Sequence, residues 1–155
     1  MALSGQSDER ITNHAGQEHR HPVQYAQRLV DFYNKVHMAQ IPPSIRGQKY
    51  ILLTTYRKTG VGVPTPVWFG EDTDKLYVMT ASNLGKTKRI RNNPSVKVAP
   101  CTIRGKVTGP EFAATARILP AGEHTRARQI INQKYWMARI PLLWRRTDTY
   151  IEISF

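Results

Sequence analysis

The segment from Leu76 to Pro94 constrains the fold most, because it joins a short strand directly to a short, strongly basic helix. Leu76 to Thr80 is rich in the β-branched and aromatic residues that are typical of a strand. Ser82 or Asn83 is the expected N-cap of the helix, since its side-chain oxygen can accept a hydrogen bond from the first free backbone N–H groups. A strand end, a polar turn and a helix N-terminus in this order form a site that suits phosphate.

The basic residues of this helix favour an anionic ligand. Lys86 falls in the first turn, where the helix dipole already presents positive charge, so a cation is unfavourable there unless an anion shares the site. Lys86 and Arg89 are three residues apart and lie on one helical face, with Ser82 upstream, which suits convergence on one phosphate. The alternative is a basic helix face that is simply solvated.

A second unusual strand lies upstream. Tyr50 to Tyr56 and Val61 to Phe69 are predicted to form a hairpin. Pro64 and Pro66 are two residues apart, so both missing N–H groups lie on the same edge of the second strand, which must be an edge strand. Such a strand leaves backbone polar groups free for a planar ligand. The alternative is an ordinary edge strand whose prolines prevent aggregation.

The remaining elements predict a mainly β protein with flanking helices. Pro22 to Ala39 is expected to be an amphipathic helix, with apolar residues at i, i+3, i+4 and i+7, that packs on the barrel or on a second subunit. A second helix is expected from Glu123 to Ala138. No βαβ repetition is present, which favours a small antiparallel barrel over a parallel sheet. The further predicted strands are Ser95 to Pro100, Phe112 to Leu119 and Tyr150 to Phe155.

Length and charge limit the function classes. The chain has 155 residues, which suits one domain from residue 22 to residue 155 after a polar tail, residues 1–21, that is expected to be mobile. A formal net charge of +12 implies attraction to nucleic acid, an acidic membrane surface or a polyanionic cofactor. Cys101 is alone, so no internal disulfide and no cysteine metal site are expected, and no apolar run is long enough to cross a bilayer. We expect a cytoplasmic protein without a metal or a membrane partner.

Four segments in a fixed order carry a resemblance to a known family: TTYRKTG, PTPVWF, LYVMTASNLGKTKRIRNNPSVKVAPC and RGKVTGP. They resemble the pyridoxamine 5′-phosphate oxidase-like split-barrel flavoproteins, and within them the branch of coenzyme F-420-dependent oxidoreductases. The resemblance covers Tyr50 to Leu119 well and the C-terminal segment more loosely. It implies a six-stranded antiparallel split β-barrel of the FMN-binding type, and a homodimer with two equivalent cofactor sites at its interface.

The resemblance also implies roles for particular residues. Lys86 matches the phosphate-binding lysine of the family, but Gly85 stands where the oxidases carry an arginine, so Lys88 or Arg89 is expected to compensate. The pyridoxal phosphate signature of the true oxidases is not recognisable, which argues against that activity. The residues assigned to the cofactor are Thr65, Pro66, Val67 and Trp68 along the isoalloxazine ring; Met79, Thr80, Ser82, Lys86, Thr87 and Arg89 around the phosphate; and Arg57 and Lys58 at a second anionic group.

The implied function is that of an oxidoreductase that binds FMN or F-420 and transfers hydride to or from a small conjugated organic substrate. The substrate pocket is expected around Tyr135 to Trp144, and no catalytic side chain is assigned. Two alternatives stay open. A nucleic-acid-binding module would use the same basic residues, although no recognition motif supports it. A flavin or haem carrier without catalytic activity would use the same barrel.

Overall fold

A computed structural model describes residues 22–38, 40–135 and 146–155. The chain divides into two compact units, residues 1–33 and residues 34–155. Helix α1, Pro22–Met38, confirms the predicted N-terminal helix. Its polar side carries a hydrogen bond of 3.0 Å from Gln27 Nε2 to Asp31 Oδ1. Among the described helices, none is long and apolar enough to span a bilayer.

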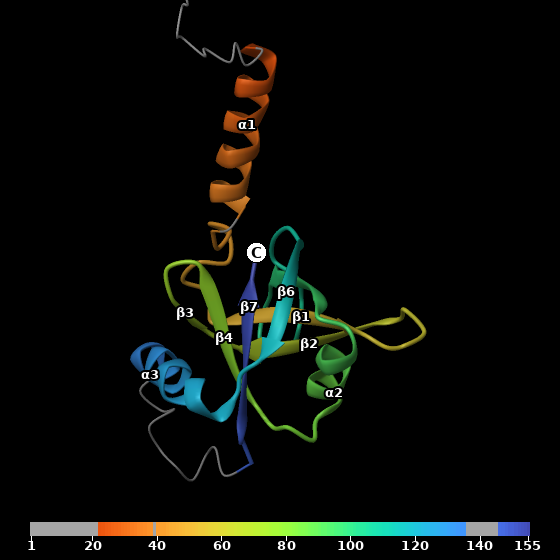
Figure 1. Cartoon of the computed structure of the whole chain (residues 1–155). Helices are drawn as coiled ribbons and strands as arrows, with labels where there is room; N and C mark the ends of the chain where they lie inside the picture. Colours follow the sequence, from red (N-terminus) through yellow and green to blue (C-terminus); the bar gives the residue numbers. More distant parts are fainter. Residues whose placement is uncertain (1–21, 39, 136–145) are drawn as a thin grey trace, which may run out of the picture. The chain divides into compact units, whose positions relative to one another are not determined.

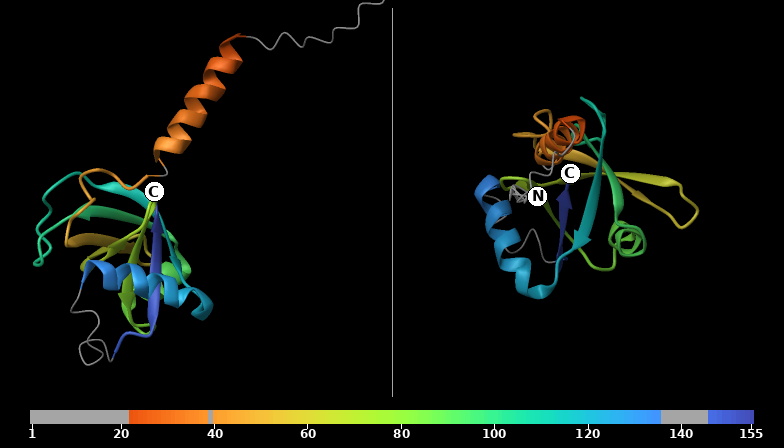
Figure 2. Two further views of the ribbon diagram at one scale, coloured as in Figure 1. Left: turned by 90° about the vertical axis from the view of Figure 1, so that its left-hand side faces the viewer. Right: turned by 45° about the horizontal axis from the view of Figure 1, so that its top comes forward.

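The second unit is built on one antiparallel sheet with the strand order β2-β1-β5-β6-β7-β4-β3 (Figure 1). The sheet curls around its core, with α2 and α3 at separate places along it (Figure 2). This arrangement confirms the antiparallel split barrel. Its elements are β1 (Tyr50–Tyr56), β2 (Gly62–Trp68), β3 (Gly70–Glu71), β4 (Lys75–Thr80), α2 (Gly85–Asn92), β5 (Ser95–Pro100), β6 (Phe112–Ile118), the 3-10 turn η1 (Ala121–Glu123), α3 (His124–Lys134) and β7 (Thr149–Ser154).

The strand count differs from the prediction. Six strands were expected, and seven are present, because Gly70 and Glu71 pair with Tyr77 and Leu76 instead of forming only a turn. The last predicted helix also differs: α3 begins at His124 after η1 and ends at Lys134. Tyr135 is its C-cap, with extended backbone, and residues 136–138 of the predicted range lie outside the described residues.

Alternation along the strands separates two faces of the sheet. The inner face forms the main core, to which Ile51, Leu53, Val78 and Ile151 contribute side chains with at most 1% exposure. On β4 and β7, the opposite face packs against α3. That second cluster comprises Tyr77, Leu119, Ala127, Ile131 and Tyr150. Alternate residues of β4 and β7 therefore pack into different hydrophobic clusters, one on each face of the sheet.

Strand β2 confirms the prediction for the proline-containing strand. It lies at the edge of the sheet, where Pro64 and Pro66 oppose Thr54 and Leu52 of β1. Both prolines are exposed, whereas Val67, which lies on the inner face of the sheet, is buried. An edge position accommodates residues that lack an N–H group, because one side of the strand makes no ladder.

Candidate functional site

The first turn of α2 presents uncapped backbone donors. The N-cap is Leu84, whose side chain makes no capping hydrogen bond, so the predicted cap at Ser82 or Asn83 is wrong. The first N–H groups of a helix have no intrahelical partner, and a leucine side chain offers them no acceptor. The N-terminus of α2 therefore keeps its donors and its positive dipole end available to an anion.

Lys86 adds a positive charge at this helix end. Its side chain is partly buried, and burial followed by the charge of Arg89 lowers its pKa. Among the side chains that the structure describes, no carboxylate forms an ion pair with Lys86. Two neighbouring cations without a counter-charge repel each other, and an anion bound between them would relieve that repulsion.

Arg89 lies over Gly85. Its Nε donates a hydrogen bond of 2.7 Å to Oγ1 of Thr55, a fully buried residue of β1. A Cβ placed on Gly85 would lie 2.8 Å from Arg89 Nη1, so the guanidinium occupies the space that a side chain at position 85 would fill. Lys88, the other expected substitute for the missing arginine, is exposed. The geometry therefore favours Arg89 over Lys88 as the residue that compensates for Gly85.

Thr80 contributes a polar atom without a partner. It ends β4, its side chain is only 2% exposed, and its Oγ1 has no hydrogen-bond partner among the described atoms. Buried hydroxyls are nearly always hydrogen bonded, so this one needs an explanation. Met79 alternates to the other face and packs beside Tyr77 and Tyr150. The two residues of the matched motif therefore point to opposite faces of the sheet.

Two of the predicted phosphate residues are engaged within the protein. The backbone N–H and Oγ of Ser82 each donate to the Asp148 carboxylate at 2.6 Å, and these bonds, with the charge of Arg91, lower the pKa of Asp148. The Thr87 hydroxyl is fully buried and donates to the Ala81 carbonyl at 2.8 Å. Both side chains fix the turn that leads into α2.

Only the inner face of β2, the predicted ring-binding strand, lies on the same side of the sheet as Thr55, the anchor of Arg89. Thr55, which anchors Arg89, pairs with Val63, and the next inward-facing pair is Leu53 with Thr65. Thr65 thus shares the inner face with the anchor of Arg89. Pro66 is exposed on the opposite face.

Trp68 also alternates to the outer side, where it stacks on Tyr135 with ring centroids 5.2 Å apart and planes inclined by 17°. Arg57 and Lys58 are exposed in the β1–β2 turn, which also contains Gly60 at φ 85°. The predicted substrate segment is described only at Tyr135, since residues 136–145 lie outside the described part.

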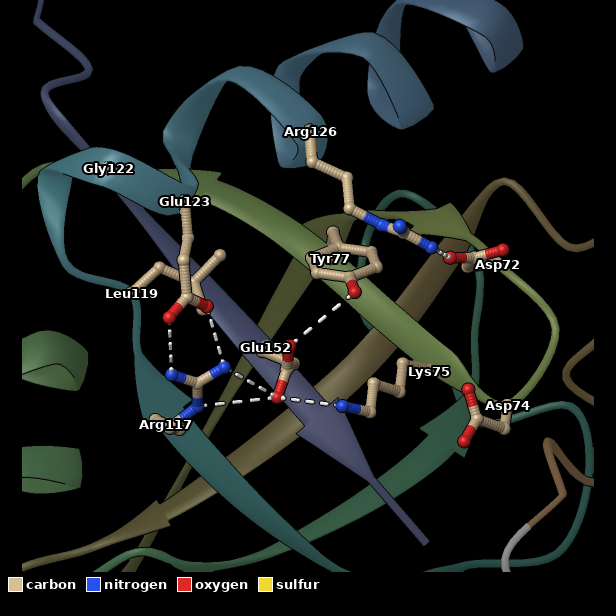
Figure 3. A pocket seen from close by; sticks show the side chains of 10 residues that line it. All are labelled: Asp72, Asp74, Lys75, Tyr77, Arg117, Leu119, Gly122, Glu123, Arg126 and Glu152. Carbon is tan, nitrogen blue, oxygen red and sulfur yellow. Dashed lines mark hydrogen bonds and ion pairs between the residues drawn. The ribbon is translucent and has the colours of Figure 1, made fainter.

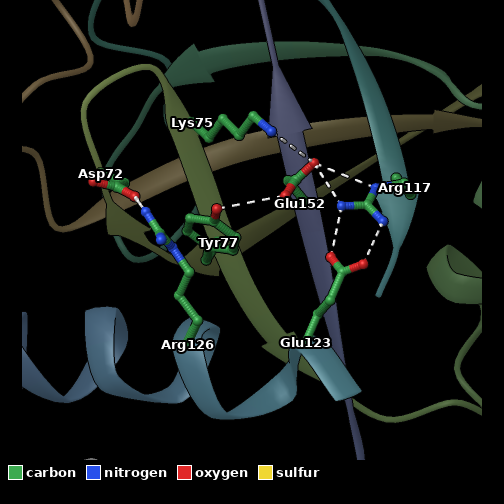
Figure 4. Close-up of polar contacts among 7 residues, drawn as sticks. All are labelled: Asp72, Lys75, Tyr77, Arg117, Glu123, Arg126 and Glu152. Carbon is green, nitrogen blue, oxygen red and sulfur yellow. Dashed lines mark hydrogen bonds and ion pairs between the residues drawn. The ribbon is translucent and has the colours of Figure 1, made fainter. Parts of the chain in front are cut away.

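A separate cavity of about 500 Å³ lies on the outer face of β4, β7 and β6, beside α3 (Figure 3). Glu152, 8% exposed, accepts hydrogen bonds from Lys75, Tyr77 and Arg117 (Figure 4). Arg117 also forms a bidentate pair with Glu123 and lowers its pKa. Burial and the Glu152 charge raise the pKa of Tyr77. None of the residues assigned to the cofactor lines this cavity.

Two residues of the candidate site escaped the sequence analysis. Thr55 lies inside a strand, where nothing in the local pattern distinguishes it from its neighbours. Asp148 lies 66 positions from Ser82, so no spacing rule connects the two. Within the described residues, no group of three or more histidine, cysteine, aspartate or glutamate side chains has the geometry of a metal site.

Comparison with known proteins places this site in a family context. The sequence profile of the F420H(2)-dependent quinone reductase family matches residues 24–151. The chain therefore belongs to this family of oxidoreductases, with the split-barrel fold described above. No curated protein matches its sequence.

Several solved structures share the fold at low sequence identity. An F420-H2-dependent reductase, FDR-A, is 17% identical with a TM-score of 0.51 over 69% of this chain and 94% of its own. HutZ, a haem storage protein of Vibrio cholerae, is 10% identical with a TM-score of 0.54 over 70% and 82%. A haem-binding protein of Mycobacterium smegmatis is 13% identical with a TM-score of 0.54 over 72% and 48%. At these identities the likeness extends to the fold alone.

Proposed function

We propose that the protein is an F-420- or FMN-dependent oxidoreductase that grips the cofactor phosphate at the N-terminus of α2. The observation that carries this proposal is the combination of uncapped helix donors with Lys86 and Arg89, which have no counter-charge among the described side chains. A phosphate accepts hydrogen bonds from backbone N–H groups, a lysine and an arginine at the same time. The unpartnered Thr80 hydroxyl is buried at the end of the preceding strand and is a further candidate donor.

The ring system is proposed to lie along the free edge of β2, over Thr65 to Trp68. An edge strand keeps backbone groups free for the polar rim of a planar ring, and Thr65 shares a face with the Arg89 anchor. When bound, a flavin exchanges hydride at N5 and a deazaflavin at C5, while the protein orients the ring and stabilises its charges. The family assignment favours F-420 as cofactor and a quinone as the conjugated substrate.

A homodimer completes this proposal, with part of each cofactor site supplied by the partner subunit. Sedimentation of the cofactor-loaded protein is expected to give the mass of a dimer. A stable monomer with full cofactor occupancy contradicts the shared site, and leaves the phosphate grip to be tested separately.

A haem carrier has less support than a flavin or deazaflavin enzyme. Among the described side chains the only histidine is His124, and its Nε2 lies 3.0 Å from the Leu119 carbonyl oxygen while its ring contacts Tyr150. The imidazole ring of His124 is therefore not positioned as an axial ligand for a haem iron. A nucleic-acid-binding role has no specific observation in its favour.

The phosphate grip is tested by Lys86→Ala, with Lys88→Ala on the exposed side of the same helix as the matched control. Titrations with F-420 and with FMN are expected to show a loss of roughly 1–3 kcal/mol of binding free energy for Lys86→Ala, the scale of a lost charged hydrogen bond. Lys88→Ala is expected to bind as the wild type does. Unchanged affinity of Lys86→Ala for both cofactors removes Lys86 from the site.

A further inference from the structure

The end of α3 is fastened to the segment that leads into β1. The ammonium group of Lys134 donates a hydrogen bond to the carbonyl oxygen of Gln48 and lies 3.6 Å from the centroid of the buried Phe69 ring. The hydroxyl of Tyr135, the C-cap of α3, donates a hydrogen bond of 2.7 Å to the carbonyl oxygen of Lys49. Two consecutive side chains are thus bound to two consecutive backbone carbonyls, which fixes the direction of the Tyr135 side chain.

The hydroxyl of Tyr135 remains a donor under ordinary assay conditions. Burial raises the pKa of Tyr135 to about 12, so the phenol keeps its proton at neutral pH. A protonated phenol can donate to a backbone carbonyl, whereas a phenolate could not. The bond to Lys49 is therefore present over the whole pH range in which the protein would be assayed.

The fixed ring of Tyr135 is stacked on Trp68. The ring centroids are 5.2 Å apart and the planes are inclined by 17°. Tyr50 directly follows Lys49, and its ring centroid lies 6.1 Å from that of the same indole, with the planes inclined by 59°. Stacked and tilted aromatic pairs attract each other beyond the effect of the area that they bury. The indole of Trp68 therefore lies against two rings whose positions are set by the same short segment of backbone.

Trp68 is the last residue of β2, the edge strand along which the cofactor ring is proposed to lie. We propose that Tyr135 is a positioning residue, which holds the indole of Trp68 in one orientation at the end of this edge. This role rests on the proposed function, because it requires the ring to lie along β2. An indole that is already ordered loses no side-chain freedom when the ring binds, so its order favours binding.

The first measurement is the mobility of the indole in the cofactor-free protein. The chain has three tryptophans, so Trp136→Phe together with Trp144→Phe leaves Trp68 as the only one. In this background Tyr135→Leu removes the stacked ring, and Gln133→Leu, at an exposed residue in the last turn of α3, is the matched control. The subnanosecond part of the fluorescence anisotropy decay is expected to grow at least about twofold with Tyr135→Leu and to stay constant with Gln133→Leu.

The second measurement is cofactor binding and turnover with all three tryptophans in place. For the reduction of menadione by reduced F-420, Tyr135→Leu is expected to raise the KM for the cofactor about two- to tenfold, the range for ordering one side chain, while kcat changes by less than about twofold. Titrations with F-420 and with FMN are expected to show the same loss of affinity. Gln133→Leu is expected to behave as the wild type does in both assays.

Tyr135→Phe keeps the stacked ring but loses the hydrogen bond to Lys49. Its effects on the anisotropy decay and on the KM are expected to have the same direction as those of Tyr135→Leu and to be smaller. Because this variant preserves the packing of the ring, it carries the test if Tyr135→Leu fails to fold.

Two results overturn the proposal. An indole that is as immobile in both Tyr135 variants as in the control shows that another contact holds Trp68. A mobile indole with unchanged cofactor affinity and unchanged KM limits Tyr135 to fastening α3. The phosphate grip is judged separately: if Lys86→Ala binds both cofactors as the wild type does while Tyr135→Leu binds them less tightly, the grip fails and the role of Tyr135 stands.

Discussion

The substitution Gly85→Ala tests whether Arg89 acts through the position of its guanidinium or only through the positive charge that it adds to α2. The new Cβ would lie 2.8 Å from Arg89 Nη1, and 3.6 Å from its Cζ, so the guanidinium must move. The contact is with the far end of a flexible side chain, and the backbone of Gly85 is not in the left-handed region, so the fold accommodates alanine. The substitution thus displaces one cation without removing it.

The two expected effects have opposite signs. Alanine is favoured over glycine by about 0.5–1 kcal/mol in a helix interior and by less at Gly85, the first residue of α2, so the stability of the cofactor-free protein is expected to stay constant or to rise slightly. Binding is expected to weaken by about 1–2 kcal/mol, or 5- to 30-fold, because a charged hydrogen bond from Arg89 to the anion is lost or lengthened. A variant that is at least as stable but binds less tightly excludes general unfolding as the cause.

The assay is thermal unfolding of the cofactor-free protein together with F-420 and FMN titrations. Gly122→Ala serves as the control, because a Cβ there meets nothing within 4 Å. It is expected to leave both affinities unchanged. If Gly85→Ala binds both cofactors as the wild type does while Arg89→Ala does not, the displacement argument is refuted. If neither variant changes binding, Arg89 has no part in the site.

Three further substitutions test the charge of Lys86, the hydrogen-bond network of Glu152 and the packing of Gly70 against α3. Lys86→Met is expected to raise the unfolding temperature of the cofactor-free protein near pH 7, because burial and the charge of Arg89 lower the folded-state pKa of Lys86, so its charged form costs stability below that pKa. A lower unfolding temperature contradicts this. Glu152→Gln is expected to lower the free energy of urea unfolding by about 2–4 kcal/mol, since it breaks a nearly buried network of hydrogen bonds. Lys97→Gln, at an exposed ion pair, is the control and should change this free energy by less than about 0.5 kcal/mol. Equal effects of the two variants would show that the network around Glu152 does not stabilise the fold. Gly70→Ala is expected to cost about 1–3 kcal/mol, because its Cβ would lie 3.0 Å from the backbone nitrogen of Ile131 in α3; a stability like that of the wild type would mean that α3 shifts freely.

Local patterns predicted the strands because each strand has one buried and one exposed face. The bounds of β1 and β5 agree with the prediction, since alternation and flanking turn residues define both. Strand β3 was missed because two residues are too few to show alternation, and its pairing depends on β4. Likewise, the local capping rule failed at Ser82 because a distant carboxylate, Asp148, binds its side chain.

The candidate site was predictable in kind but not in detail. The basic helix, its position after a strand and the proline-containing edge strand were all visible in the sequence. The sequence offered Lys88 or Arg89 as the residue that compensates for Gly85 but did not choose between them, because the choice depends on the path of a side chain that Thr55 anchors from another strand. The cofactor roles of the individual residues stay predictions until ligand titrations test them.

Strand β4 shows how the structure keeps the proposed site apart from the ion-pair network. Lys75, Tyr77 and Met79 face α3, where Glu152 of the neighbouring strand accepts hydrogen bonds from the first two. Thr80 has the opposite parity and faces the inner side, immediately before the turn to α2. The network therefore fastens α3 to the sheet without contributing a carboxylate to the phosphate side. A carboxylate beside Lys86 and Arg89 would neutralise them and compete with the anion. Asp148, the carboxylate at the turn into α2, is instead held by Ser82, and among the described side chains it forms no ion pair with Lys86 or Arg89, which leaves both cations to the anion of the proposed function.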